Sequence, residues 1–175
     1  MASPVTEAAQ RIFADLADPQ AVNRDASGAW KAPLWRALEE AGLTLAWVPE
    51  ALGGAGARLA EGFEVLAAAG RYALAAPLAE TLLAGWLLAR GGLAAPAGMM
   101  SLAPAQPAEP IALDVEGTLR GRARAVPFAP EAAHFAVLAQ GANGVHVALV
   151  EARACKVDAG KNLAGDSRGE VVFDG

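Results

Sequence analysis

The spacing of apolar residues changes near residue 92, and this change limits what the chain can fold into. Before it, apolar residues recur every three or four positions, which is the period of an amphipathic helix. After residue 96 they alternate in short runs separated by turn residues, which is typical of strands. Helices followed by strands, without strand–helix–strand units, predict an α+β chain built from two parts.

The first part is expected to be a helical bundle. Its helices are predicted over residues 4–17, 33–41, 59–70 and from 77 to the Gly91-Gly92 pair. Gly42 suits the left-handed position after the second helix, where Leu43 can fold back onto Leu38. Apolar residues lie almost all the way round the last helix, so we expect this chain or a partner subunit to cover it.

The second part is expected to be a small antiparallel β-barrel or sandwich. Strands are predicted over residues 111–115, 118–125, 134–139, 144–150 and 170–173. Asn143-Gly144 favours a hairpin because asparagine and glycine both tolerate positive φ. We therefore expect two domains, a helical one over residues 1–95 and a β domain over residues 96–175.

Composition and charge exclude several classes of function. The chain has 175 residues, with 19 acidic and 14 basic side chains. This acidic balance argues against nucleic acid or an anionic membrane as a partner. The most apolar stretch, residues 81–89, is too short for membrane insertion. Without a signal-peptide pattern, a cytoplasmic location is expected.

No metal site or catalytic motif follows from spacing alone. Cys155 is the single cysteine, and His134 and His146 lack the spacing of metal ligands. The glycine-rich segment at residues 53–56 has no strand before it, so a tight loop is favoured over a phosphate cradle. Glu80 lies in the first turn of the last predicted helix, where either a functional role or the helix dipole explains an acid.

Motifs in the first part follow one another in an informative order. They are Leu38-Glu39-Glu40-Ala41-Gly42-Leu43, then Val48-Pro49-Glu50-Ala51-Leu52-Gly53-Gly54-Ala55-Gly56, then Gly70-Arg71 and Pro77-Leu78-Ala79-Glu80-Thr81. This series resembles the N-terminal domain of acyl-CoA dehydrogenases, with its "elGl" and "vPEexGGxg" segments. In the second part, Asp166-Ser167-Arg168 and Val171-Val172-Phe173-Asp174-Gly175 resemble the segment that closes the family's middle β domain.

The resemblance implies a flavoprotein of lipid metabolism that binds FAD and performs α,β-dehydrogenation of an acyl-CoA thioester. In the family a third domain, a four-helix bundle, supplies the catalytic glutamate. That bundle is lacking after Gly175, so we expect a truncation, no catalytic residue here and an inactive chain by itself. The resemblance also implies a homo- or hetero-oligomer of acyl-CoA dehydrogenase subunits.

The family's cofactor motifs correspond to two stretches of this chain. The implied FAD-binding residues are Leu102, Ala103, Pro104, Val126, Pro127 and Phe128. The first three begin the stretch that corresponds to the family's "TEPxxGSD" motif, from which most hydrogen-bonding side chains are missing. The last three correspond to a segment that packs on the flavin ring, although proline removes a backbone donor there.

Three hypotheses remain open. The first is a FAD-dependent acyl-CoA dehydrogenase, present as its N-terminal and middle domains. The second is a non-catalytic structural subunit of a heteromeric acyl-CoA dehydrogenase that has lost its own flavin site. The third is an unrelated binding module made of helices and strands.

Overall fold

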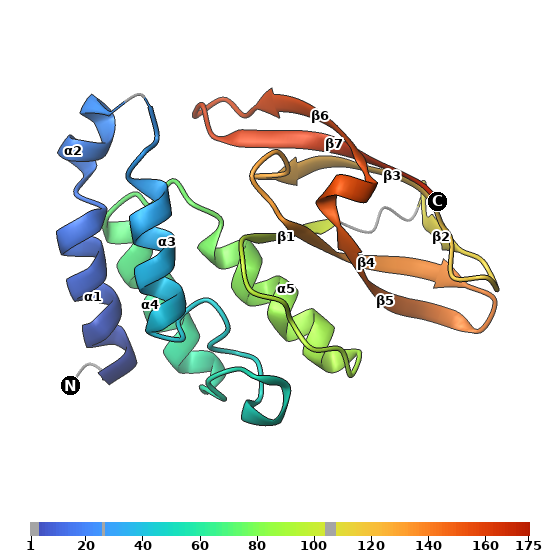
Figure 1. Cartoon of the computed structure of the whole chain (residues 1–175), viewed down its shortest axis with the longest axis horizontal. Coiled ribbons are helices and arrows are strands. Elements are labelled where there is room, and N and C mark those ends of the chain that lie inside the picture. The colour runs from blue at the N-terminus through green and yellow to red at the C-terminus, as the bar shows by residue number, and fades with distance from the viewer. Residues whose placement is uncertain (1–3, 26, 104–107) are drawn as a thin grey trace.

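The helices and strands fall into two groups that pack against each other (Figure 1). The computed structural model of the chain describes residues 4–25, 27–103 and 108–175. The helices are α1 (Pro4–Leu16), α2 (Pro19–Arg24), α3 (Lys31–Glu40), α4 (Leu59–Arg71) and α5 (Leu78–Arg90), with short 3₁₀ turns at Glu50–Leu52 and Ala152–Ala154. The strands are β1 (Met100–Ala103), β2 (Ile111–Leu113), β3 (Leu119–Pro127), β4 (His134–Gly141), β5 (Gly144–Glu151), β6 (Lys156–Lys161) and β7 (Ser167–Asp174).

The helical group is held by a core of its own, and the four predicted helices are found. Fully buried Phe13, Leu34, Leu38 and Val65 come from α1, α3 and α4. The stop after α3 forms as expected: Gly42 has a φ of 68°, and the backbone N–H of the next residue donates to the Leu38 carbonyl at 2.9 Å. The short α2 was not predicted. It begins at Pro19, which suits the first position of a helix as well as the end of the previous one.

The strands form one sheet that is open and not purely antiparallel. The order is β1-β4-β2-β3-β7-β6, and β5 pairs with the other side of β4. β1 and β2 both run parallel to β4, whereas the remaining pairs are antiparallel. The chain between β1 and β4 contains two further strands, which gives the long connection that parallel pairing needs. Among the described residues no pairing joins β5 to β6. The expected α+β class is therefore found, but its β part is one open sheet and not a closed barrel or a sandwich.

The helices join the sheet mainly through α5, which lies against it in Figure 1. A small apolar cluster bridges the two groups, formed by Ala84, Leu88, Met100 and Ala136. The hydroxyl of the fully buried Thr81 bonds both the N–H and the C=O of Met100, at 3.0 and 3.1 Å. Glu39 accepts a hydrogen bond from the Gly98 N–H at 2.7 Å, and Lys31 pairs with Glu131 at 3.0 Å. The joint is therefore both packed and hydrogen-bonded.

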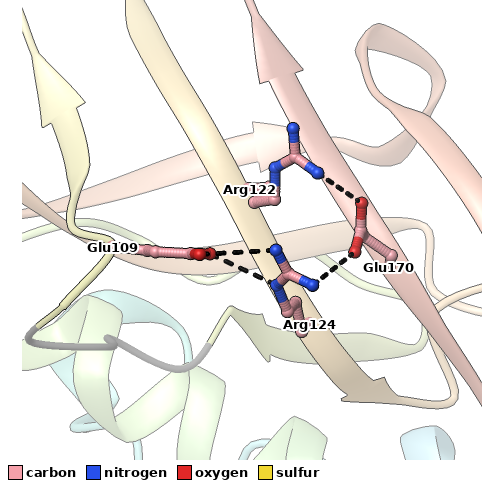
Figure 2. Close-up of polar contacts among 4 residues, drawn as sticks. All are labelled: Glu109, Arg122, Arg124 and Glu170. Carbon is pink, nitrogen blue, oxygen red and sulfur yellow. Dashed lines mark hydrogen bonds and ion pairs between the residues drawn. The ribbon is translucent and has the colours of Figure 1, made fainter.

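A ladder of opposite charges covers the outer face of β3 and β7 (Figure 2). Arg124 lies between Glu109 and Glu170, and Arg122 bonds the other oxygen of Glu170 at 3.3 Å. These side chains are about half exposed or less. Such exposed pairs contribute little stability each, roughly 0–1 kcal/mol, and they keep this face polar.

Candidate functional site

A cleft lies between the α4–α5 region and the ends of β3 and β7. It consists of two cavities of about 430 and 350 Å³ that share Asp166 as a lining residue. The larger is lined mostly by apolar residues of α4, the α4–α5 link and α5. The smaller is more polar than the larger and is lined by Glu80, Ala125, Pro127, Phe128, Asn162, Asp166, Ser167 and Arg168.

Unusual backbone conformations gather in this cleft. Ala73, Ala125 and Phe128 have φ values of 47°, 59° and 49°. Ala73 lines the larger cavity, and Ala125 and Phe128 line the smaller one. They are the non-glycine residues with positive φ in the described part of the chain. Such a conformation costs roughly 1–2 kcal/mol for a residue with a Cβ, and strained residues tend to cluster at functional sites. Alanine gives no sequence signal for this conformation, so sequence reasoning missed Ala73 and Ala125.

The position of Phe128 follows from local features of β3. The pairing of β3 with β7 shifts register between Ala123 and Val126, which turns the end of the strand toward the cleft. Ser101 donates from its hydroxyl to the Pro127 carbonyl at 2.6 Å, and the Phe128 N–H donates to the Ser167 carbonyl at 2.8 Å. These bonds fix the half-buried Phe128 at the cleft wall.

Charged groups face the cleft from both sides. Glu80 comes from the first turn of α5, and burial, together with the negative charge of Asp166, raises the pKa of its carboxyl. Asp166 is oriented by Asn162, whose amide donates to it at 2.9 Å. Arg168 on β7 is half-buried and forms no ion pair with a carboxylate of the described residues. The cleft thus combines a cation, two carboxylates and an aromatic ring.

The six residues that the family resemblance implies as cofactor ligands are not gathered in one place. Pro127 and Phe128 line the cleft. Val126 and Ala103 are buried in the core of the sheet, and Leu102 packs into the cluster beneath α5. Pro104 lies outside the described residues. Glu80, for which the sequence left both a functional role and the helix dipole as explanations, faces the cleft.

An apolar groove continues from the cleft along the surface of α4 and α5. It has a volume of about 410 Å³ and is lined by Trp47, Leu59, Phe63, Leu66, Ala79, Leu83 and Trp86. It shares Leu66 and Ala79 with the larger cavity. Phe63 is 60% exposed, and its ring packs edge-on against Trp47 with 5.1 Å between centroids. Leu83 on α5 is 44% exposed, so this chain by itself does not cover the whole helix, and cover by a partner subunit stays a prediction.

The described part of the chain contains neither a metal cluster nor a membrane span. Within residues 4–25, 27–103 and 108–175, no group of three histidine, cysteine or acidic side chains is placed to hold a metal ion. None of the helices described above is long and apolar enough to cross a bilayer.

The chain matches one protein family and is similar to a set of solved structures. A model of the acyl-CoA dehydrogenase N-terminal domain matches residues 3–95, which is more than half of the chain. No curated protein matches the sequence.

Solved structures match the fold along nearly the whole chain. A Tcur3481-Tcur3483 steroid ACAD variant is 28% identical with a TM-score of 0.78, and the match covers 97% of this chain and 54% of that one. The ChsE4-ChsE5 complex from Mycobacterium tuberculosis is 25% identical with a TM-score of 0.76, covering 98% and 53%. An acyl-CoA dehydrogenase from Geobacillus kaustophilus shares the fold at 15% identity and a TM-score of 0.72, covering 97% and 54%. The chain spans about half the length of these structures.

Proposed function

Because this chain belongs to the acyl-CoA dehydrogenase family, we propose that it acts in the FAD-dependent α,β-dehydrogenation of an acyl-CoA thioester. It would supply the family's N-terminal domain over residues 1–95 and the middle domain over residues 96–175, in the cytoplasm. The observation that carries the proposal is the cleft between α5 and the end of β3, which is lined by the Phe128 ring, the Arg168 guanidinium and two carboxylates.

The residues of the cleft fit the ring system of FAD better than its pyrophosphate. The Phe128 ring offers a flat apolar face, and Ser167 and Arg168 offer donors that suit the carbonyl oxygens of the flavin ring. Glu80 and Asp166 add negative charge, which opposes a pyrophosphate nearby. When bound, FAD supplies the acceptor for the hydride that leaves the β-carbon.

The chain's own part in this chemistry is to bind, orient and exclude water. The apolar face of α5 and the groove beside it would shield the acyl group, with the thioester toward the polar cavity. The α-proton would go to a base that lies outside residues 1–175, because the family's catalytic glutamate belongs to its third domain. Glu80 is placed on the cleft wall and is assigned no proton-transfer step.

The first experiment measures flavin binding by the purified full-length protein. FAD is titrated while its visible absorption and fluorescence are followed, for the parent and for Phe128→Ala and Arg168→Ala. Both variants should bind FAD more weakly, whereas Arg153→Ala should not, because that side chain is 85% exposed and lies away from the cleft. A colourless protein that takes up no FAD would contradict the proposal.

The acyl group to test first is a steroid thioester. One 28% identical structure is described as a steroid ACAD. The aromatic side chains of Trp47, Phe63 and Trp86 give the groove broad flat walls, which suit fused rings as well as straight chains. Anaerobic bleaching of the flavin by a steroid-acyl-CoA should then outpace bleaching by a straight-chain acyl-CoA of equal carbon number. The reverse order would contradict this assignment.

A second candidate function is a structural subunit of a heteromeric dehydrogenase. Leu102 and Ala103 contribute no side-chain donors and are packed beneath α5 and in the sheet core. The ChsE4-ChsE5 structure is a complex of two proteins. Co-expression with a second acyl-CoA dehydrogenase subunit should then give a complex with one flavin per pair of chains. One flavin per chain would favour the first candidate.

A further inference from the structure

The two edge strands of the open sheet are protected very differently. β6 carries Lys156, Asp158 and Lys161 among its six residues, and charged side chains on an edge discourage pairing with another chain. β5 is longer, with eight residues, and Glu151 at its end is its single charged side chain. Figure 1 shows β5 at the rim of the sheet, beyond β4. β5 is therefore the edge that is open to pairing.

The β4–β5 hairpin determines which backbone groups of β5 point outward. Gly141 and Gly144 pair across a two-residue turn. In such a hairpin the flanking pair exchanges both hydrogen bonds, and bonded and non-bonded pairs alternate from there. The N–H and C=O of Val145, Val147 and Leu149 therefore point away from β4. In the described part of the chain, these groups take part in no backbone hydrogen bond outside the ladder.

The same three residues form an apolar stripe on one face of the sheet, because alternate side chains of a strand share a face. Val145 is 67% exposed and Leu149 is 37% exposed. Val147, between them, packs beside the cluster under α5, where the missing Cβ of Gly91 allows close approach. Unpaired backbone groups and exposed apolar side chains thus coincide along β5.

We propose that β5 pairs in an antiparallel arrangement with β5 of a second copy of this chain, with Val147 on the twofold axis. In this register Val147 faces Val147 of the partner subunit, and Val145 faces Leu149 of the partner subunit. All three resulting pairs join outward-pointing backbone groups, which gives about six hydrogen bonds. The apolar stripes of the two copies continue each other on the same face.

A second copy fits this edge because the strand is complementary to itself. In the proposed register His146 faces Ala148 of the partner subunit, so no like charges oppose each other. A shift by one residue would bring groups that already bond β4 to the new edge, and would break the match. The pairing is independent of flavin or acyl-CoA binding, because neither cavity of the cleft includes a β5 residue.

A charge-swap series tests both the interface and its register. Val145→Lys and Leu149→Glu should each raise the dimer Kd at least about tenfold, because each places an unpaired charge against an apolar residue at two symmetric positions. The double variant V145K/L149E should recover most of the affinity, because each new lysine then faces a new glutamate. Val115→Lys is the matched control, since Val115 is 94% exposed and lies outside β5.

Sedimentation velocity measures the dimer, and amide hydrogen exchange locates it. In the parent protein, the amides of Val145, Val147 and Leu149 should be protected, and in the single variants they should exchange freely. The amides of His146 and Ala148 face β4 and should stay protected in all folded variants, which also reports whether a variant has folded. Free exchange of the three outward amides in the parent overturns the proposal. So does a double variant that is no tighter than the single ones.

Discussion

At the scale of single residues, Glu80 should make the stability of the fold depend on pH. Its pKa is raised above the ordinary 4.5, mainly by burial and also by Asp166. A carboxyl with a raised folded-state pKa stabilises the fold below its unfolded pKa, and this contribution is lost as pH rises through the folded value. Glu80→Gln should therefore increase stability at neutral pH and flatten the dependence on pH above about 4.5.

Urea unfolding at a series of pH values measures this effect. Glu40→Gln is the control, because Glu40 is exposed on α3 and should leave the curve unchanged. If the curves of Glu80→Gln and the parent run parallel between acid and neutral pH, the interpretation of Glu80 is wrong.

Two glycines of α4 should respond in opposite ways to the same substitution. A Cβ on Gly62 would lie 2.0 Å from Nε1 of Trp47, whereas one on Gly70 would meet nothing within 4 Å. Gly62→Ala should cost roughly 1–3 kcal/mol by overpacking. Gly70→Ala should stabilise by up to about 1 kcal/mol through lower unfolded-state entropy. Denaturant midpoints of the two variants provide the measurement, and equal shifts would contradict this packing.

Sequence reasoning reached some cleft residues and could not reach others. Phe128 and Pro127 were found because the family resemblance pointed to them, and Glu80 because an acid interrupts an apolar helix. Leu102, Ala103 and Val126 were implied by the same resemblance, but strand alternation and the approach of α5 turn them into the core. Ala125 could not be foreseen, since its conformation depends on a register shift against a strand over forty residues away.

At the scale of elements, Thr81 is the link between α5 and β1. Its hydroxyl satisfies two backbone groups of Met100 in a fully buried position. Thr81→Val keeps the shape and removes both bonds, which should cost about 1–3 kcal/mol because an unpaired buried N–H remains. Thr81→Ser keeps the hydroxyl and should recover most of that loss. Thermal unfolding of both variants tests the difference, and equal loss in both would assign the effect to packing.

Some helices and strands were predictable because their signals are local in the sequence. Long helices and the β4–β5 hairpin depend on local signals, such as apolar spacing and a turn of asparagine and glycine. β6 has no such signal: its residues are mostly exposed, and it forms because β7 offers an edge to pair with. The parallel pairing of β1 with β4 joins residues more than thirty positions apart, so no local pattern can reveal it.

At the scale of the whole molecule, the two groups should unfold together. All four tryptophans, Trp30, Trp35, Trp47 and Trp86, belong to the helical group, so their fluorescence reports on that group, whereas circular dichroism reports on both. Because an apolar cluster joins the groups, the two signals should give one midpoint in urea.

Leu88→Ala tests this coupling, since Leu88 is fully buried in the bridging cluster. It should cost about 2–5 kcal/mol and separate the fluorescence and dichroism transitions. Leu38→Ala removes a leucine from the helical core alone and should lower the midpoint while the transitions stay coincident. Two separate transitions in the parent protein would contradict the coupling.

The bonds from Thr81 to Met100 and from Glu39 to Gly98 also bear on motion. Thr81 ties α5 to β1 and Glu39 ties α3 to the α5–β1 connection, so a hinge rotation between helices and sheet would have to break the buried Thr81–Met100 bonds. We therefore expect the entry of a ligand to depend on side-chain rotation at the cleft mouth, which takes picoseconds to nanoseconds in exposed residues. On this view the cleft takes its shape when the chain folds, and we expect a ligand to bind it without rotation between helices and sheet.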